Sequence, residues 1–274
     1  MPSPKNLTRI EEPVDLDAAL AAALEAAREA CAILVQGQSQ LTEGMVKTKS
    51  PGDVTTIIDR QAEDAIRTCL QAKFPEFAFT GEESGTSGQS RCRWIVDPLD
   101  GTMNYLHGFP FYAVSLALTM DDRIVLGVVA DPVRGETFHA MLGRGAFLNG
   151  NPIHVSATCE LEKALVGTVV PPPRWAGHDE YLRRFCRLST KAAGIRRAGA
   201  AALDLAYVAA GRLDGYFVES LKAWDIAAGM LLVTEAGGRT ADIFEEGSPL
   251  VTNRLAAANG HLLPALLGVL SDQI

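Results

Sequence analysis

Apolar residues near the start of the chain recur at the spacing of an amphipathic helix. They predict a helix from Leu16 to about Gln36, for which Asp15 can serve as the N-terminal cap. A second apolar stripe predicts a helix from Asp59 to about Lys73. Between them, residues 37–51 are polar and predict a flexible connection. The first part of the chain is therefore predicted to be mainly helical.

The pattern changes to strands between Phe111 and Asn149. Segments rich in Val, Leu, Phe and Thr predict strands at Tyr112–Met120, Ile124–Ala130 and Glu136–Met141. Asn149-Gly150 is a strong turn signal and predicts a hairpin between segments 145–148 and 152–155. Because no helix separates these strands, we expect an antiparallel meander. A short strand is also predicted at Phe77–Thr80, and residues 85–91 are predicted to form a surface loop.

After about Ser156, predicted strands alternate with predicted helices. The strands are 164–170, 194–197, 215–219, 240–243 and 255–259, and the helices are 178–191, 199–211, 226–236 and 261–271. This alternation favours a partly parallel sheet with helices on its faces, so the fold class is mixed α+β and α/β. We place a boundary near 156, between an α+β half (1–155) and an α/β half (156–274). No flexible linker separates the halves, so we expect one catalytic unit.

Composition and charge narrow the classes of function. Of the 274 residues, 47% are hydrophobic, which is enough for a substantial core. The net charge of −8 argues against a general nucleic-acid surface, and an anionic substrate would need a bound cation to reverse the local charge.

The cysteines and the N-terminal segment indicate the cellular compartment in which the protein is expected. The five cysteines are scattered and form no CxxC pair, which argues against a disulfide framework and a thiolate zinc site. Met1–Pro13 is polar and has no apolar signal core, and no apolar run of about 18 residues predicts a membrane span. We therefore expect a cytoplasmic protein.

The segment from Trp94 to Leu106 carries the clearest chemical signal. An apolar run ends in Asp97, followed by Pro98, Leu99, Asp100 and then Gly-Thr. This order predicts a strand, a tight turn and the start of a helix, with two carboxylates beside free backbone N–H groups. Such a turn suits a hard cation that itself holds a phosphate.

Other acidic residues stand in similar positions. Glu82 follows the strand predicted at Phe77–Thr80, and Asp225 precedes a predicted helix. Each has a simpler explanation when taken alone, because Glu82 can be a solvated surface acid and Asp59 and Asp225 can be helix caps. Taken together, the carboxylates form an oxygen-only set that suits Mg²⁺ or Mn²⁺, and no histidines stand at metal-binding spacing. The residues alone do not show that Glu82 and Asp225 meet.

Several motifs, in order, resemble those of the inositol monophosphatase family. They are Asp53–Asp59, Gly81-Glu82-Glu83, Trp94–Asn104, Gly211–Phe217, Trp224–Gly229 and Thr234–Gly238. The resemblance runs from about residue 16 to the end of the chain. It implies a layered αβαβα sandwich with a large antiparallel sheet and a second mixed, partly parallel sheet. It also implies Mg²⁺-dependent, lithium-sensitive hydrolysis of a phosphate monoester and a homodimer.

The resemblance also implies roles for individual residues. Glu82, Asp97 and the Leu99 carbonyl would hold a first Mg²⁺; Asp97, Asp100 and Asp225 would hold a second; and Glu82 would support a third through water. Mn²⁺ is a possible substitute. Asp59 and Thr102 would orient and deprotonate the attacking water, with Glu82 as a further catalytic residue. The residues implied to contact the substrate are Asp100, Gly101, Thr102, Ala201, Glu219 and Asp225.

One position departs from the family pattern. Members acting on inositol phosphates commonly carry a glutamate that bonds a sugar hydroxyl, where this chain has Val218 with Glu219 one residue later. A shift of one residue on a strand turns a side chain to the opposite face. Either a local bulge brings Glu219 into the site, or the polyol contact is lost.

The leading hypothesis is therefore hydrolysis of a small phosphorylated polyol, with myo-inositol 1-phosphate as the first candidate. Histidinol phosphate, fructose 1,6-bisphosphate and 3′-phosphoadenosine 5′-phosphate are alternatives with the same chemistry. An alternative of another class is a regulatory binding protein of transcription or RNA-processing complexes that retains the fold. No membrane partner and no direct nucleic-acid contact are expected.

Overall fold

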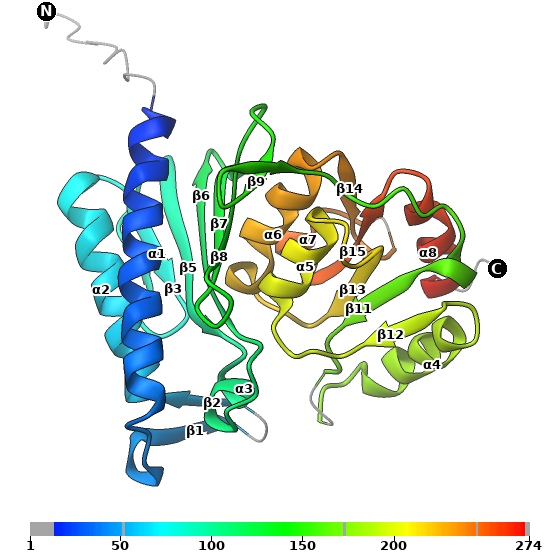
Figure 1. The fold of residues 1–274 in the computed structure, drawn as a ribbon, viewed down its shortest axis with the longest axis horizontal. Helices are drawn as coiled ribbons and strands as arrows, with labels where there is room; N and C mark the ends of the chain where they lie inside the picture. The colour runs from blue at the N-terminus through cyan, green and yellow to red at the C-terminus, as the bar shows by residue number, and fades with distance from the viewer. Residues whose placement is uncertain (1–13, 51–52, 172–173, 245, 272–274) are drawn as a thin grey trace, which may run out of the picture.

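The chain folds into five layers, in the order helices, sheet, helices, sheet, helices (Figure 1). The computed structural model describes residues 14–50, 53–171, 174–244 and 246–271. The predicted polar N-terminal segment, Met1–Pro13, lies outside this part of the chain. Within it, no helix has the length and apolar character needed to cross a membrane. The layered architecture agrees with the fold class predicted from the sequence.

Helices α1 (Leu16–Gln38) and α2 (Ile57–Lys73) form the first layer. The Asp15 carboxylate accepts the N–H groups of Asp17 and Ala18, so it caps α1 as predicted. Helix α2 begins earlier than predicted, because the hydroxyl of Thr56 caps it. The segment between the helices, predicted to be flexible over residues 37–51, contains a single turn, η1 (Glu43–Met45), and the strand β1 (Val46–Ser50). Strand β1 pairs with a second short strand, β2 (Asp53–Thr56), just beyond the predicted segment.

The large sheet has the strand order β10-β9-β8-β7-β6-β5-β3-β4. Its strands are β3 (Ala78–Gly81), β4 (Gly85–Ser87), β5 (Cys92–Asp100), β6 (Ala113–Met120), β7 (Arg123–Asp131), β8 (Glu136–Met141), β9 (Ala146–Leu148) and β10 (Asn151–Ile153). All neighbours are antiparallel except β3 and β5. The segment 85–91, predicted as a loop, contributes the edge strand β4; its exposed polar residues carry no apolar alternation that would indicate a strand.

The second sheet has the order β12-β11-β13-β15-β14 and mixes parallel with antiparallel pairs. Its strands are β11 (Leu165–Thr168), β12 (Gly194–Arg196), β13 (Gly215–Glu219), β14 (Gly238–Ala241) and β15 (Arg254–Asn259). Helices α4 (His178–Ser189) and α8 (Leu262–Leu270) cover its outer face. The single turn η2 (Leu161–Lys163) precedes β11, and the short helix α7 (Pro249–Thr252) precedes β15.

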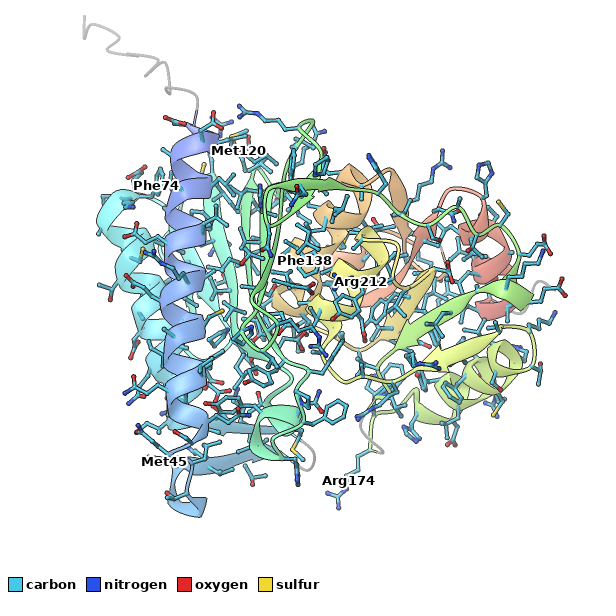
Figure 2. The ribbon with its side chains drawn as sticks, viewed as in Figure 1. Met45, Phe74, Met120, Phe138, Arg174 and Arg212 are labelled. Carbon is cyan, nitrogen blue, oxygen red and sulfur yellow. The ribbon has the colours of Figure 1, made fainter. Side chains whose placement is uncertain are left out.

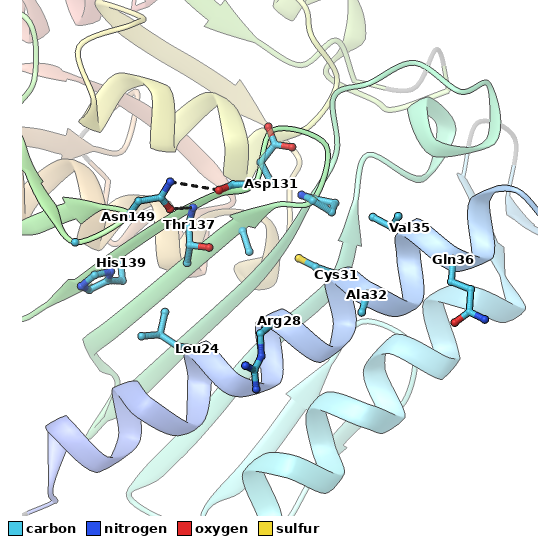
Figure 3. A pocket seen from close by; sticks show the side chains of 14 residues that line it. Leu24, Arg28, Cys31, Ala32, Val35, Gln36, Asp131, Thr137, His139 and Asn149 are labelled. Atoms are coloured by element: carbon cyan, nitrogen blue, oxygen red, sulfur yellow. Dashed lines mark hydrogen bonds between the residues drawn. The ribbon is translucent and has the colours of Figure 1, made fainter.

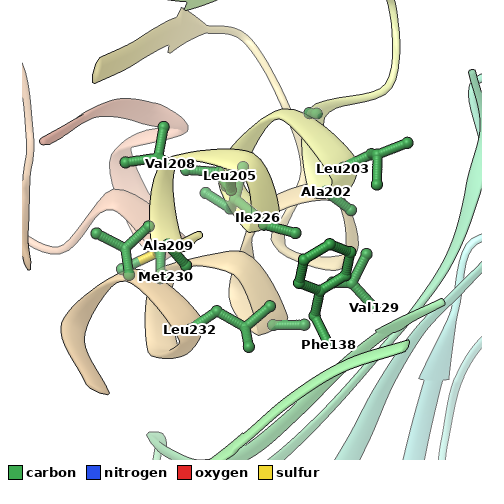
Figure 4. Close-up of a cluster of buried hydrophobic side chains, with 14 of the residues drawn as sticks. Val129, Phe138, Ala202, Leu203, Leu205, Val208, Ala209, Ile226, Met230 and Leu232 are labelled. Carbon is green, nitrogen blue, oxygen red and sulfur yellow. The ribbon is translucent and has the colours of Figure 1, made fainter. Parts of the chain in front are cut away.

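Helices α5 (Ala201–Ala209) and α6 (Ala223–Glu235) lie between the two sheets and carry much of the core (Figure 4). Glycines keep this layer thin. A Cβ added at Gly229 would lie 2.5 Å from the Cβ of Leu205, and one added at Gly127 would lie 2.8 Å from the Ala228 carbonyl oxygen. Gly229 therefore allows α6 to pack closely on α5, and Gly127 allows β7 to pack closely on α6. The result is that the N-terminal ends of α5 and α6 come close to the end of β5.

The core and one ion pair cross the boundary placed near residue 156. Phe138 of β8 packs in the same cluster as Leu203 and Leu232. Arg212, which follows α5, donates to both carboxylate oxygens of Glu136 at 2.6 Å, and its guanidinium lies over the Phe138 ring (Figure 2). These contacts support our proposal that the segments 1–155 and 156–274 act as one unit.

Candidate metal and phosphate site

A β-bulge near the end of β5 places two aspartates on one face. The sequence predicted a tight turn after Asp97, but the strand continues to Asp100. Asp97 pairs with Ser115 of β6 and Asp100 with Ala113, so β5 has one extra residue between these pairs. Residues three apart on a regular strand point to opposite faces, and the extra residue restores Asp100 to the face of Asp97. Pro98 is tolerated here because it lies in the bulge, where the ladder with β6 is interrupted and no backbone N–H is required.

The N-terminal ends of the two middle helices hold the second and third aspartates. The Asp100 carboxylate accepts the backbone N–H of Ala202, at the start of α5, at 2.7 Å. Asp225 lies in the first turn of α6 and accepts the N–H of Lys222 at 2.6 Å. Asp225 is therefore inside the helix, with Lys222 at the cap position, whereas the sequence predicted Asp225 as the cap itself.

Ser115 connects α6 to β5. Its hydroxyl donates to the carbonyl oxygen of Trp224 at 3.0 Å, and it is the register partner of Asp97. The residue before Asp225 is therefore tied to the strand position opposite Asp97. In this way residues more than a hundred positions apart are brought together.

Asp97, Asp100 and Asp225 form one cluster, in which each contributes a carboxylate oxygen within 4.8 Å of the others. Burial, together with the neighbouring carboxylates, raises the pKa of Asp97 and of Asp100 well above the usual range. Burial also raises the pKa of Asp225 to about 7. The crowding of these carboxylates around Asp97 would be relieved by a divalent cation bound among them. The donor set fits Mg²⁺, because it consists of carboxylate oxygens alone.

Glu82 joins this cluster from the end of β3. Its backbone N–H bonds the Val96 carbonyl of β5 at 3.1 Å, next to Asp97. Its carboxylate is not simply solvated, because the Lys49 ammonium lies 3.0 Å from it and 2.6 Å from the Glu83 carboxylate. Burial raises the pKa of Glu82, and Lys49 opposes that rise. The structure thus brings Glu82 and Asp225 to the same site, which the sequence left open.

Asp59 and Thr102 are also in contact. Asp59 is buried in the first turn of α2, where its carboxylate accepts the N–H and the hydroxyl of Thr56 at 2.9 and 2.5 Å. Its other oxygen lies 3.2 Å from the Thr102 hydroxyl, which also lies 3.1 Å from the Leu99 carbonyl oxygen. Burial raises the pKa of Asp59 to about 6. Asp59 therefore completes the cap that Thr56 begins at the start of α2, and it also contacts Thr102.

The backbone conformation at position 101 requires glycine. Its φ of +93° lies in the left-handed region, and an added Cβ would lie 3.1 Å from the Phe111 carbonyl oxygen and 3.2 Å from the Ala200 Cβ. Gly101 immediately precedes α3 (Thr102–Leu106), so the backbone turns sharply beside Asp100. Ala201 is buried in the first turn of α5, directly before the Ala202 N–H that binds Asp100.

Glu219 does not join the cluster. Strand β13 pairs with β15 from Gly215 to Glu219 without a register shift, so no bulge turns Glu219 inward. Val218 packs with the core between the sheets, whereas Glu219 lies on the opposite face, and its carboxylate binds Arg184 of α4 at 3.2 Å. The structure therefore does not bring Glu219 to the clustered carboxylates, because its carboxylate is buried against Arg184.

Three charged residues near the site were missed in the sequence. Lys49 binds Glu82; Glu63 accepts the Glu83 N–H at 2.9 Å beneath Gly81; and Asp204 is buried on α5 with one oxygen lacking a partner among the described residues. Burial raises the pKa of Asp204 well above the usual range. An acid in an otherwise alanine-rich helix was the one available signal, and it pointed to Asp204.

The crowded carboxylates predict that pH and Mg²⁺ act together on stability. The pKa of Asp59 is about 6 and that of Asp225 about 7 in the folded chain, against about 3.9 in an unfolded one. Because the folded state then binds more protons, stability of the metal-free protein should fall as pH rises from 5.5 to 8. Mg²⁺ should offset this loss, so it should raise Tm by about 5 °C more at pH 8 than at pH 5.5.

Calorimetry in chelator and in Mg²⁺ across this pH range measures the effect. The Asp225→Asn variant is the control, since it removes one crowded carboxylate and should flatten the metal-free pH dependence. A metal-free Tm that rises from pH 5.5 to 8 would contradict the expectation.

Known proteins are similar to this chain along nearly its whole length. Residues 15–274 match the inositol monophosphatase family. The chain is 44% identical to the inositol-1-monophosphatase of Rhizobium meliloti over 84% of this chain and 87% of that protein. It is 43% identical to the Nus factor SuhB of Pseudomonas aeruginosa over 92% of this chain and 95% of that protein.

Solved structures of known proteins have a similar fold along nearly the whole chain. The extragenic suppressor protein suhB from Bartonella henselae is 41% identical, with a TM-score of 0.89 over 94% of this chain and all of that chain. The inositol monophosphatase from Anabaena is 34% identical, with a TM-score of 0.82 over 94% of this chain and 97% of that chain.

Proposed function

The chain belongs to the inositol monophosphatase family, a family of phosphoric monoester hydrolases, and from this we propose that it hydrolyses a small phosphorylated polyol with Mg²⁺. The observation that carries the proposal is the cluster of Asp97, Asp100 and Asp225 with Glu82 beside it. myo-Inositol 1-phosphate is the first candidate substrate, because a relative at 44% identity is named inositol-1-monophosphatase.

The carboxylates divide into two overlapping sets of metal ligands. Glu82, Asp97 and the Leu99 carbonyl would hold one Mg²⁺, and Asp97, Asp100 and Asp225 would hold another. A third ion near Glu82, replacement by Mn²⁺ and inhibition by lithium belong to the same proposal. When bound, the ions would neutralise the phosphate dianion, lower the pKa of a water molecule and stabilise the leaving alkoxide.

In this proposal, Asp59 and Thr102 remove a proton from the attacking water. The Thr102 hydroxyl lies between the Leu99 carbonyl and Asp59, so it can pass a proton to the Asp59 carboxylate. With a pKa of about 6, Asp59 is ionised at neutral pH and able to accept that proton. The N–H groups of Gly101 and Thr102 would bind phosphate oxygens, with Ala201 as part of the wall around the substrate.

An assay panel tests the proposal. Purified protein with Mg²⁺ is given myo-inositol 1-phosphate, histidinol phosphate, fructose 1,6-bisphosphate and 3′-phosphoadenosine 5′-phosphate, and released phosphate is measured. The inositol ester should show the highest kcat/KM. Absence of turnover on every ester would refute a hydrolase function, and a different best substrate would replace inositol phosphate.

Replacing Thr102 by alanine should reduce turnover more than metal affinity. The variant keeps every carboxylate but loses the hydroxyl beside Asp59, so kcat should fall about 100-fold while Mg²⁺ affinity stays within about twofold. Steady-state kinetics and calorimetric Mg²⁺ titration separate the two effects. Thr68→Ala is the control, since its hydroxyl bonds only its own helix on the exposed surface. A parallel loss of Mg²⁺ affinity in Thr102→Ala would assign the hydroxyl to the metal site instead.

Glu219→Gln should affect stability and leave substrate selectivity unchanged. Glutamine weakens the buried pair with Arg184, which should lower stability by about 2 kcal/mol. The ratio of kcat/KM for inositol 1-phosphate to that for β-glycerophosphate should stay within about twofold, because the side chain faces away from the cluster. A fall in that ratio at unchanged Tm would indicate that Glu219 contacts the substrate.

A second candidate function rests on the relatives' names. A relative named Nus factor SuhB is almost as similar to this chain as one named inositol-1-monophosphatase. A binding role in transcription or RNA-processing complexes is therefore the alternative. Recovery of polymerase subunits with both the native chain and Asp100→Asn would support a binding role independent of catalysis, and recovery of none would oppose it.

Two further expectations belong to the same proposal. The family resemblance supports a homodimer. All five cysteines are free thiols, which supports a cytoplasmic location.

A further inference from the structure

A cavity lies on the opposite side of the large sheet from the middle helices. It has a volume of about 830 Å³ and lies between α1 and the strands β7 and β8 with their turns (Figure 3). We call it the α1–β8 groove, and the lining residues that matter here are Leu24, Arg28, Cys31, Val35, Thr137 and His139. Neither the clustered carboxylates nor Thr102 lines it.

The groove exists because α1 covers only part of the sheet. Small buried residues of α1, such as Ala23, Ala27 and Ala30, pack against β6 and β7, and α1 does not extend over β8 and β9. The larger side chains Leu24 and Cys31 point from α1 toward the uncovered strands (Figure 3). Val35 is left 53% exposed on the same helix. An apolar floor is thus left without a covering element in the described part of the chain.

The far wall offers an aromatic surface. His139 of β8 is half-buried and stacks on Phe147 of β9, with ring centres 5.2 Å apart and an interplanar angle of 14°. Burial lowers the pKa of His139, so the imidazole is neutral at physiological pH and offers a flat apolar face. Such a face suits a flat aromatic group.

One charge in the groove lacks a compensating group. Arg28 is exposed and makes no hydrogen bond or ion pair among the described residues, although Glu25 lies nearby on the same helix and pairs with Lys73. The Asp131 carboxylate, also in the groove wall, is fully buried and already accepts from Arg134 at 2.9 Å and from the Val133 N–H at 2.8 Å. Arg28 is therefore the one cationic side chain among the described lining residues, and the carboxylate of the same lining, Asp131, is already paired with Arg134.

We propose that the α1–β8 groove binds a small organic anion with an aromatic body and a single acidic group. The body would lie beside Leu24 and His139, and the acidic group would pair with Arg28, one turn along α1 from Leu24. The volume lies in the range of about 300–1,000 Å³ typical of small-molecule sites, and a mostly apolar lining with few polar groups is typical of them as well. This site is separate from the hydrolytic site and does not depend on the proposed function.

Two fluorescent probes that differ in one charge test the proposal. The full chain, with Mg²⁺ present, is titrated with 8-anilinonaphthalene-1-sulfonate and, separately, with the uncharged N-phenyl-1-naphthylamine. The native protein should bind both saturably with one site. Arg28→Gln should weaken the sulfonate about fivefold and leave the neutral probe unchanged, since an exposed ion pair contributes up to about 1 kcal/mol.

Two further variants complete the design. Val35→Glu should weaken both probes, the sulfonate by about tenfold or more, because it adds a carboxylate to the apolar floor. Arg123→Gln is the matched control, since it removes an exposed arginine outside the groove and should change neither affinity. Tm values confirm that every variant is folded.

Four results would overturn the proposal. They are no saturable binding to the native protein, equal effects of Arg28→Gln and Arg123→Gln, displacement of the sulfonate by inorganic phosphate, and conversion of a dimer into a monomer by Val35→Glu. The third result would place the probe in the catalytic site. The fourth would show that a second copy of the chain covers the groove.

Discussion

Asp225→Asn should reduce turnover about 1,000-fold or more without unfolding the protein. The substitution removes one of three carboxylates that lie within 4.8 Å of one another and keeps an oxygen that can accept the Lys222 N–H. Because the pKa of Asp225 is already raised to about 7 by burial, the neutral amide should leave the metal-free Tm unchanged or higher at pH 8. Mg²⁺ should no longer raise Tm by its native increment.

Three measurements define this outcome: kcat with Mg²⁺, Tm in chelator, and Tm in Mg²⁺. Asp179→Asn is the control, because Asp179 is an exposed acid in the first turn of α4, outside the cluster. Near-normal turnover by Asp225→Asn would show that this carboxylate is a structural part of α6 and not a metal ligand.

Asp59→Asn should have the second-largest effect, with kcat falling about 1,000-fold. The amide oxygen can still accept the Thr56 N–H, so the start of α2 should remain intact and Tm should change by only a few degrees. The lost function is the ability to take a proton through Thr102. Mg²⁺ affinity should be nearly native, because Asp59 is not among the clustered aspartates.

Asp64→Asn on the exposed face of the same helix controls for the change of charge. If Asp59→Asn lowers Tm and Mg²⁺ affinity but not kcat, Asp59 serves only as part of the helix cap. If kcat falls alone, its place as the base is supported.

The two substitutions also distinguish metal binding from proton transfer in the proposed mechanism. Asp225 lies on α6 and belongs to the cluster with Asp97 and Asp100. Asp59 lies on α2, outside this cluster, and contacts the hydroxyl of Thr102. Loss of the Mg²⁺ effect on Tm should therefore follow Asp225→Asn and not Asp59→Asn.

Local sequence patterns predicted many elements because their causes are local. Asp15 caps α1 through N–H groups two and three residues away, and the spacing of apolar residues marks the helix. Strands β8 and β13 begin and end where the sequence predicted them, because alternation and turn residues bound them within a few positions. The family motifs likewise pointed to Glu82, Asp97, Asp100 and Asp225 before any contact among them was known.

Features that depend on partner strands or distant charges were not predictable in this way. The bulge that turns Asp100 to the side of Asp97 is defined only against β6, and the sequence therefore indicated a tight turn. Strands β1, β2 and β4 are short and polar, and they exist because a neighbouring strand completes their hydrogen bonds. Lys49 and Glu63 reach the site from other elements, so nothing near them in the sequence marked their roles.

The sequence by itself determined many of the helices and strands, because helix periodicity and strand alternation are properties of neighbouring positions. Its short motifs, through their resemblance to a known family, indicated the layered architecture and the acidic residues of the site. Only the tertiary structure decided that Glu82 and Asp225 meet, that Asp59 contacts Thr102, and that Glu219 turns away toward Arg184. These outcomes depend on strand register and on packing of α5 and α6 between the sheets. A shift of one residue in register would reverse each side chain's face without changing the local pattern that the sequence displays.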